Sequence, residues 1–312
     1  MPENFLLPVP RWLAWAFWGV YLLFCVLFYQ ERALFLDGAF QLFHLVNEES
    51  IQIYHYRFVT ALPQVLPFAA VVLHAPLKGV MLLYSLSYGL FFLGVFWLVF
   101  HRWRNEALGW TLIFYLTLLG LDTFYHIQSE YYLGIALLIL VYALVLRHPG
   151  LPGRVFAVGG LLLLTVAFAH KLTFIFFLFL WGYFGLLYPS LRHRRYLVLL
   201  LLMVAIVALK SAYFTNWYEV MKQEDFNRHL AAYWPHLHTL PAHRIFGGRL
   251  LHHYWVWALF LAGVSVFLLR GREYLKLLWV WGTAVGYLLL YHIADPLSPY
   301  RFYAEVTYLP LA

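Results

Sequence analysis

Charged residues are scarce in this chain, where they make up 11% of the 312 residues against 64% hydrophobic residues. A soluble fold of this length cannot bury so much apolar surface, so lipid must be the main solvent of the protein. The composition therefore predicts an integral membrane protein of the all-α class, a multi-pass bundle of transmembrane helices without a soluble domain of useful size.

Cysteine is nearly absent as well, because Cys25 is the only one and lies in the first apolar run. A single cysteine excludes a disulfide framework and a cysteine-rich metal site. The net charge of +7 could suggest nucleic-acid binding, but the basic residues sit in short loops between apolar runs, where they set membrane orientation. We therefore expect no nucleic-acid partner.

Long apolar runs are what the chain has in abundance. A hydrocarbon core about 30 Å thick needs roughly 20 apolar residues per helix. Suitable runs lie at about 12–29, 79–100, 107–121, 129–146, 155–169, 172–187, 197–213, 251–269 and 276–292, and another begins near 302. We expect about ten spans in one domain over 1–312, the first of them retained because no small-residue cleavage site follows it. Ala312 lies inside an apolar run, so further spans are expected after it.

The charges of the connecting loops predict the orientation of the chain. Four connections hold ten Lys and Arg residues against two acids: 101–106, 147–154, 191–196 and 270–276. By the positive-inside tendency these loops face the cytoplasm. The long connections 30–78 and 214–250 then face outward, and ten of the fourteen acids lie in outward connections. We therefore expect the chemistry of the protein on its outer face.

This alternation holds only if 58–74 does not cross the membrane. Pro63 and Pro67 interrupt that stretch with helix-breaking spacing, which favours an interfacial or re-entrant segment in the first outer loop. The alternative is a full span with an outside N-terminus. The loops from residue 101 onward keep their sides in both cases.

Asp37 is the first candidate for a catalytic residue. It follows the first apolar run by eight residues in LDGAF, and Gly38 allows a sharp turn into the amphipathic run 40–46. The carboxylate is thus expected at the membrane surface. The competing interpretation is a helix N-cap, a position that Asp fills well, and the two roles can coexist.

Three polar residues recur every four positions in LDTFYHIQSEYY. If the helix begins early, Asp122, His126 and Glu130 project from one face at the outer boundary. Such a set either binds a divalent cation, with His126 and Glu130 as the candidate ligands, or lines a polar pocket, which is the favoured interpretation.

Two further cations lie at outward turns. In AHKLTF, Lys171 follows His170, and it either snorkels to lipid headgroups or neutralises a lipid-linked phosphate as it leaves. Arg301 in YRFYAE can bind phosphate bidentately and is the better phosphate anchor of the two. Glu305, inside an apolar run, should face the bundle interior and pair with Arg301 at i, i+4 spacing.

The loop 214–250 contains several histidines and aromatic residues. HLHTLPAH has no recognised metal-ligand spacing, and neighbouring Trp and Tyr residues favour an interfacial helix. No catalytic role is predicted for these histidines.

The order of these pieces resembles the GT-C superfamily of glycosyltransferases, the relatives of protein O-mannosyltransferases and lipid A aminoarabinose transferases. The matching features are Asp37 soon after the first span, a first outer loop with interfacial helices, HAPLKG at 74–79, AHKLTF and YRFYAEVTYLP. The chain departs from the family where Gly38 follows Asp37 in place of a second acid, and where Leu77–Lys78 replace an aromatic pair.

The resemblance implies a sugar transfer from a polyprenyl-phosphate donor to a glycan, lipid or protein acceptor, on the outer face of a bacterial inner membrane. It implies that Asp37 accepts the proton of the acceptor hydroxyl, while Lys171 and Arg301 hold the departing phosphate. Asp122, His126, Glu130, His170 and Glu305 would line the pocket. The resemblance does not decide whether a divalent metal is required, and it implies no other cofactor.

Two other classes of function remain. An O-antigen polymerase or ligase also acts on lipid-linked glycans and relies on outer-loop arginines, for which Arg228, Arg244 and Arg249 are candidates. A transporter or lipid-binding protein is disfavoured, because transporters place ionisable residues near the bilayer midplane and the span centres here are nearly free of charge.

Overall fold

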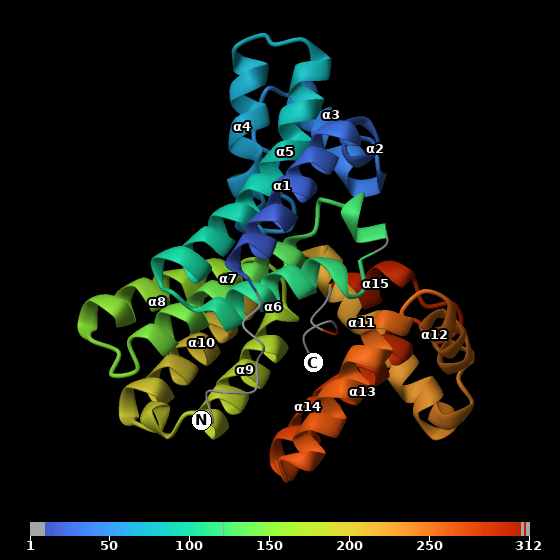
Figure 1. Cartoon of the computed structure of the whole chain (residues 1–312). Helices are drawn as coiled ribbons and strands as arrows, with labels where there is room; N and C mark the ends of the chain where they lie inside the picture. The colour runs from blue at the N-terminus through green and yellow to red at the C-terminus, as the bar shows by residue number, and fades with distance from the viewer. Residues whose placement is uncertain (1–9, 121, 307–308, 310–312) are drawn as a thin grey trace.

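The protein is helical throughout the part of the chain that the structure describes. This computed structural model describes residues 10–120, 122–306 and 309, and it contains no strand among them. Figure 1 shows most of the helices packed together, with α4 and the start of α5 projecting from the rest. The all-α class predicted from composition is confirmed.

Helices form close to where the apolar runs lie. In chain order they are α1 Arg11–Leu27, α5 Leu77–Phe96 with its π-helical extension η2 Trp97–Arg102, α6 Glu106–Thr117, α7 Glu130–Arg147, α8 Gly153–Ala167, α9 Thr173–Leu187, α10 Arg194–Tyr213, α13 Trp255–Arg270 and α14 Tyr274–Ala294. The run expected from 302 begins as α15 Arg301–Glu305, and 307–308 and 310–312 lie outside the described residues.

The number of spans is smaller than the sequence predicts. By length and apolarity, four helices can cross a membrane, namely α5 with η2, α7, α10 and α14. A fifth span arises if α12 Pro241–His252 and α13 count together, although they meet at 90°. The apolar helices α1, α8 and α9 have only 15 to 17 residues. The described chain therefore supports four or five candidate spans, and about ten is not confirmed.

The loops gather at two ends of the bundle. At one end Arg11 pairs with Glu106, and Arg195 donates to the carbonyl oxygens of Gly150 and Leu151 at 3.3 and 3.0 Å. We call this the basic end, with the loops between α5 and α6, α7 and α8, α9 and α10, and α13 and α14. The other loops form the site end, described below.

The first long loop folds into helices α2 Tyr29–Ala33, α3 Leu36–Asn47, η1 Phe58–Thr60 and α4 Ala61–Val72. The expectation that two prolines break this stretch is wrong. Pro63 lies in the first turn of α4, where no N–H partner is required, and Pro67 lies inside the continuous helix at the loss of one hydrogen bond. With 12 residues, α4 is about 18 Å long, shorter than a hydrocarbon core.

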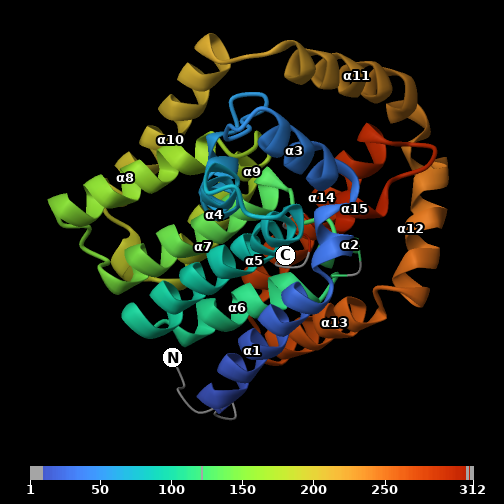
Figure 2. The ribbon, with the colours of Figure 1, turned by 90° about the horizontal axis from the view of Figure 1, so that it is seen from above.

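The second long loop is also helical. It contains α11 Trp217–Tyr233, η5 Trp234–Thr239 and α12. Seen from above, α11 and α12 follow the outer edge of the molecule, around α2 and α3 (Figure 2). The prediction of a helix in this loop is confirmed.

Small residues let the central helices approach closely. Every residue of α7 from Tyr131 to Val145 is buried, which makes α7 the centre of the core. The indole of Trp279 in α14 fills the space above Gly182 of α9, where a Cβ would overlap it, and its Nε1 donates to the carbonyl oxygen of Phe179 at 3.2 Å. Without a side chain, Gly182 leaves the space that the indole occupies.

Candidate functional site

Charged side chains from segments far apart in the sequence meet at the site end. They form three groups, each centred on a carboxylate or a carboxylate pair: Asp37 with His126, Asp122 with Arg301 and Glu305, and a cationic network around Glu130 and Glu219. Each group joins two or more loops.

Asp37 stands at the start of α3 with its side chain 73% exposed. It lies in the first turn of α3 and is not the N-cap, since that position belongs to Phe35, which makes no side-chain cap. The sharp turn is made by Leu36, whose φ of 43° is unfavourable for a leucine, and not by Gly38. The chain thus accepts local strain to present this carboxylate.

His126 is the neighbour of Asp37. Its Nε2 lies 3.8 Å from Oδ2 of Asp37, and its ring is 4% exposed. Burial lowers the pKa of His126, against the opposing effect of Asp37 and Glu130, so the imidazole is neutral at pH 7. A neutral imidazole does not offset the negative charge of the Asp37 carboxylate.

A buried arginine positions the segment that carries His126. Arg32 of α2 is fully buried, and its Nε donates to Oγ of Ser85 at 2.9 Å. Its guanidinium also donates to the carbonyl oxygen of Phe124 and lies 4.4 Å from the centre of the Phe124 ring. Arg32 therefore fixes the 122–126 segment against α2 and α5.

Asp122, His126 and Glu130 do not share one helix face, contrary to the prediction. Asp122 belongs to the short 3-10 helix η3 Asp122–Phe124, whereas α7 begins only at Glu130, where Ser129 caps it. The hydroxyl of Ser129 accepts from the backbone N–H of Tyr132, and so ends any earlier helical turn. The three side chains therefore have different partners.

Asp122 pairs with Arg301 at 3.0 Å. The predicted pairing of Arg301 with Glu305 is wrong, because Glu305 instead accepts from the backbone N–H groups of Asp122 and Thr123 at 2.7 and 3.1 Å and from the Tyr254 hydroxyl at 2.9 Å. Glu305 is 1% exposed, as expected of an acid that faces the bundle interior. It holds η3 in place, which aims Asp122 at Arg301.

The cationic network begins with Arg57 and Glu130, whose side chains pair at 3.1 Å and are almost buried. Next to them Glu219 of α11 lies between two lysines, with Lys171 at 3.2 Å and Lys210 at 4.0 Å. Lys171 thus has Glu219 as its carboxylate partner. Three cations face two carboxylates here, which leaves a net positive charge.

His170 confirms that this region is positive. Burial, and then the cations Arg57, Lys210 and Lys171, hold the pKa of His170 well below its usual range. Its Nδ1 accepts from the backbone N–H of Leu172 at 3.1 Å, which requires the neutral ring. The site therefore disfavours one more positive charge and favours an anion.

The two long loops, 30–78 and 214–250, are joined beside this network. Nδ2 of Asn216 donates to the carbonyl oxygen of His55 at 3.3 Å, while its Oδ1 caps α11. The His55 ring stacks on Tyr218 with centroids 4.4 Å apart, and the guanidinium of Arg57 lies 5.6 Å from the centre of the Tyr218 ring. Movement of α11 would therefore be felt at Arg57.

Metal binding is a second interpretation of His126 and Glu130. Among the residues that the structure describes, no three His, Cys, Asp or Glu side chains are grouped closely enough to hold a metal ion. Glu130 binds Arg57 instead.

The structure brings the predicted residues to one end of the bundle without joining them directly. Asp37, Lys171 and Arg301 each have a different partner, His126, Glu219 and Asp122 respectively. The arginines of the polymerase hypothesis divide as well, since Arg228 pairs with Asp225 on α11, while Arg244 and Arg249 border a cavity on α12.

Sequence reasoning missed Arg57, Lys210 and Glu219. A signal existed for Lys210, because a lysine inside the apolar run 197–213 is costly unless it is paired. Arg57 and Glu219 looked like ordinary loop residues, and only the packing of the loops shows their burial.

Comparison of this chain with protein-family models, with curated proteins and with solved structures finds no match.

Proposed function

We propose that this protein is a membrane glycosyltransferase that takes a sugar from a polyprenyl-phosphate donor. In this proposal the chain crosses a bacterial inner membrane about ten times and the site end faces outward. The observation that carries the proposal is the exposed carboxylate of Asp37 beside a neutral His126, at the same end of the bundle as a network with excess positive charge.

In the proposed reaction the acceptor hydroxyl oxygen bonds to C1 of the sugar as the bond from C1 to the phosphate oxygen breaks. The bonding electrons leave with the lipid phosphate, and Asp37 accepts the hydroxyl proton. Its 73% exposure makes the carboxylate reachable by an acceptor of any of the expected classes, glycan, lipid or protein.

The departing phosphate gains charge in the transition state, so fixed cations accelerate the step. Lys171 and Arg301 are the accessible cations, 39% and 38% exposed. Each already has a carboxylate partner, so the phosphate would compete with Glu219 and Asp122. Lys210 and Arg57 are more buried, and they add positive potential without needing to touch the ligand.

The test is sugar transfer by the full chain in liposomes with a polyprenyl-phosphate sugar. We expect Asp37→Asn to lower the rate by about 100-fold or more, because it removes the base and keeps the shape of the side chain. Glu49→Gln is the matched control, since Glu49 is an exposed acid of the same loop. Full activity of Asp37→Asn would overturn the catalytic assignment.

Transfer that survives Asp37→Asn but is lost when Arg228, Arg244 and Arg249 are replaced would instead support the polymerase or ligase hypothesis. Ion-coupled flux without any product would support a transporter.

A further inference from the structure

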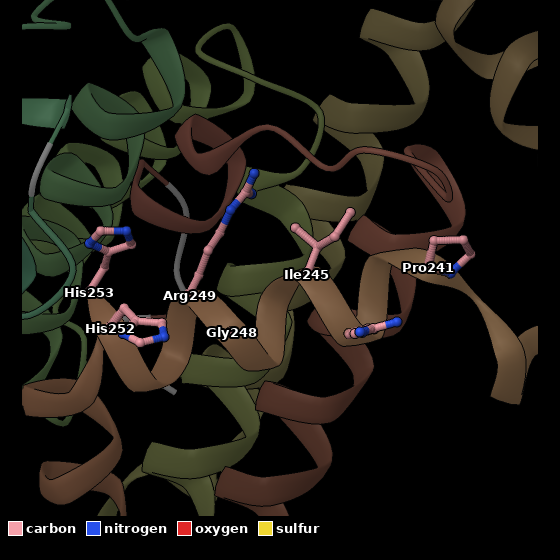
Figure 3. Close-up of a pocket in the computed structure, with 7 residues that line it drawn as sticks. Pro241, Ile245, Gly248, Arg249, His252 and His253 are labelled. Atoms are coloured by element: carbon pink, nitrogen blue, oxygen red, sulfur yellow. The ribbon is translucent and has the colours of Figure 1, made fainter.

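A basic cavity lies on α12, outside the groups described above. It has a volume of about 760 Å³ and is lined by Pro241, Arg244, Ile245, Gly248, Arg249, His252 and His253. At 100° per residue these positions fall on one half of the helix circumference. Figure 3 shows Arg249 and Ile245 projecting from the same side of α12, with His252 and His253 at its end. The cavity therefore belongs to one continuous helix face.

The lining contains cations and no carboxylate. Arg244 is exposed and, within the described ranges, makes no hydrogen bond or ion pair. Arg249 donates to the carbonyl oxygen of Pro299, which uses part of its donor set and fixes its direction. This differs from the site end network, where Lys171, Arg57 and Arg301 each face a carboxylate. The missing counter-charge points to an external anion.

The centre of the cavity is left open by a glycine. A Cβ at Gly248 would meet no atom within 4 Å, so the backbone can be approached closely there. Gly in the middle of a helix costs about 1 kcal/mol relative to Ala. A glycine at this position allows a ligand to approach the helix backbone closely.

The direction of α12 places the cavity at the membrane surface. Because α12 and α13 meet at 90°, a membrane-crossing α13 makes α12 lie in the membrane plane. Leu251 at 74% and Trp255 at 55% are exposed at the corner, where an interfacial helix meets acyl chains and headgroups. A ligand that reaches this cavity from the bilayer presents its headgroup to Arg244 and Arg249.

We propose that the α12 cavity binds the phosphate group of an anionic membrane lipid, with Arg244 and Arg249 as its principal contacts. The guanidinium groups match phosphate oxygens, and His252 and His253 add donors at the end of the face. The same chemistry suits free inorganic phosphate, but the membrane-plane orientation of α12 favours the lipid. The inference does not depend on the glycosyltransferase proposal, because it concerns another site.

Binding can be measured without any transfer reaction. The full chain in uncharged detergent is titrated with phosphatidylglycerol, with phosphatidylcholine and with inorganic phosphate, and bound lipid is counted by native mass spectrometry. We expect saturable binding of phosphatidylglycerol, weakened about tenfold by Arg244→Gln, which corresponds to about 1.4 kcal/mol. Arg228→Gln is the matched control, an exposed arginine on α11 outside the cavity, and it should bind like the wild type.

A second variant separates the cavity from general surface charge. Gly248→Leu keeps every charge, adds a better helix former and fills the centre of the cavity, so it should abolish the saturable binding. Undiminished binding by a folded Gly248→Leu protein, or equal weakening by Arg244→Gln and Arg228→Gln, overturns the proposal. Inorganic phosphate that displaces the lipid at equal concentration overturns the lipid as the source and leaves a site for soluble phosphate.

Discussion

The two ends of the bundle use arginine and lysine in different ways. At the basic end Arg192 donates to the carbonyl oxygens of Gly185 and Leu186 at 2.8 and 2.9 Å, at the end of α9, and so offsets unpaired helix carbonyls. At the site end Arg57 and Lys171 pair with carboxylates from other loops. The Arg192 contact finishes a helix locally, and the Arg11–Glu106 pair of the same end is largely exposed, whereas the site-end pairs hold distant segments together with at least one side chain buried or nearly so.

This difference indicates at which end the charged side chains are held in fixed positions. Most of the basic-end contacts join neighbours in the chain or leave the side chains exposed, so each contributes little to stability. The site-end groups are buried in part, and removing one member leaves a charge without its partner in a poorly solvated place. Fixed pairs of opposite charge are thus expected to matter most at the site end.

The largest expected effect comes from breaking the Arg57–Glu130 pair. Arg57→Ala leaves the almost buried Glu130 carboxylate, at the start of α7, without its partner, and should lower the free energy of unfolding by about 3–5 kcal/mol. Denaturant unfolding in detergent micelles measures this loss. Arg57→Ala together with Glu130→Gln should recover part of it, and a double variant no better than the single one would mean that the pair is not the cause.

Acid should weaken the site end next. The neutral imidazoles of His126 and His170 have lowered pKa values in the folded protein, while unfolded histidine titrates near 6.5. The unfolded chain therefore binds more protons as the pH falls, and each histidine contributes a loss of up to about 1.4 kcal/mol per pH unit below 6.5.

Unfolding free energies at pH 7, 6 and 5.5 test this slope. His170→Asn keeps an acceptor for the Leu172 N–H and removes the titrating ring, so its slope should be shallower than that of the wild type. His252→Asn, the same substitution at an exposed histidine, is the matched control. A His170→Asn slope equal to the wild type would show that His170 already carries its proton when folded.

A smaller effect is expected from releasing the two lysines. Glu219→Gln frees Lys171 and Lys210 from their carboxylate and should tighten the binding of a short-chain isoprenyl phosphate about tenfold. Glu224→Gln, an exposed acid on the same helix, serves as the control for net charge. Equal tightening in both variants would assign the gain to the overall field and not to the pair.

The smallest effect is expected from breaking an exposed ion pair at the basic end. The Arg11 and Glu106 side chains are 71% and 41% exposed, so Arg11→Ala should cost less than about 0.5 kcal/mol of unfolding free energy. The same unfolding assay as for Arg57→Ala applies. A loss as large as that of Arg57→Ala would remove the distinction between the two ends.

The apolar runs of the sequence predict where helices form, but not which of these helices are long enough to cross a membrane. The runs at 129–146 and 276–292 become α7 and α14 almost unchanged. The run at 251–269 includes the 90° corner between α12 and α13, because hydropathy reports how apolar a segment is and not the direction in which its helices run. Pro67 gave the opposite error: it predicted a break, but α4 continues through it without the N–H of that residue.

Sequence spacing predicts the end of the molecule that holds the site, but not the partners within it. Asp122 and Glu130 are eight residues apart, two steps of four, yet Ser129 caps a new helix between them. Arg301 lies four residues from Glu305 and still pairs with Asp122, because η3 brings that carboxylate closer. Partners set by tertiary packing are invisible to local periodicity.

The packing of the Trp279 indole above Gly182 restricts the motion of α14 relative to α9. To slide along α9, α14 would have to withdraw the Trp279 indole and break its bond to Phe179, so these two helices act as a fixed frame. Any rearrangement of α11 and α12 would then have to occur in the non-helical connections that join them to α10 and α13, at 214–216 and 253–254.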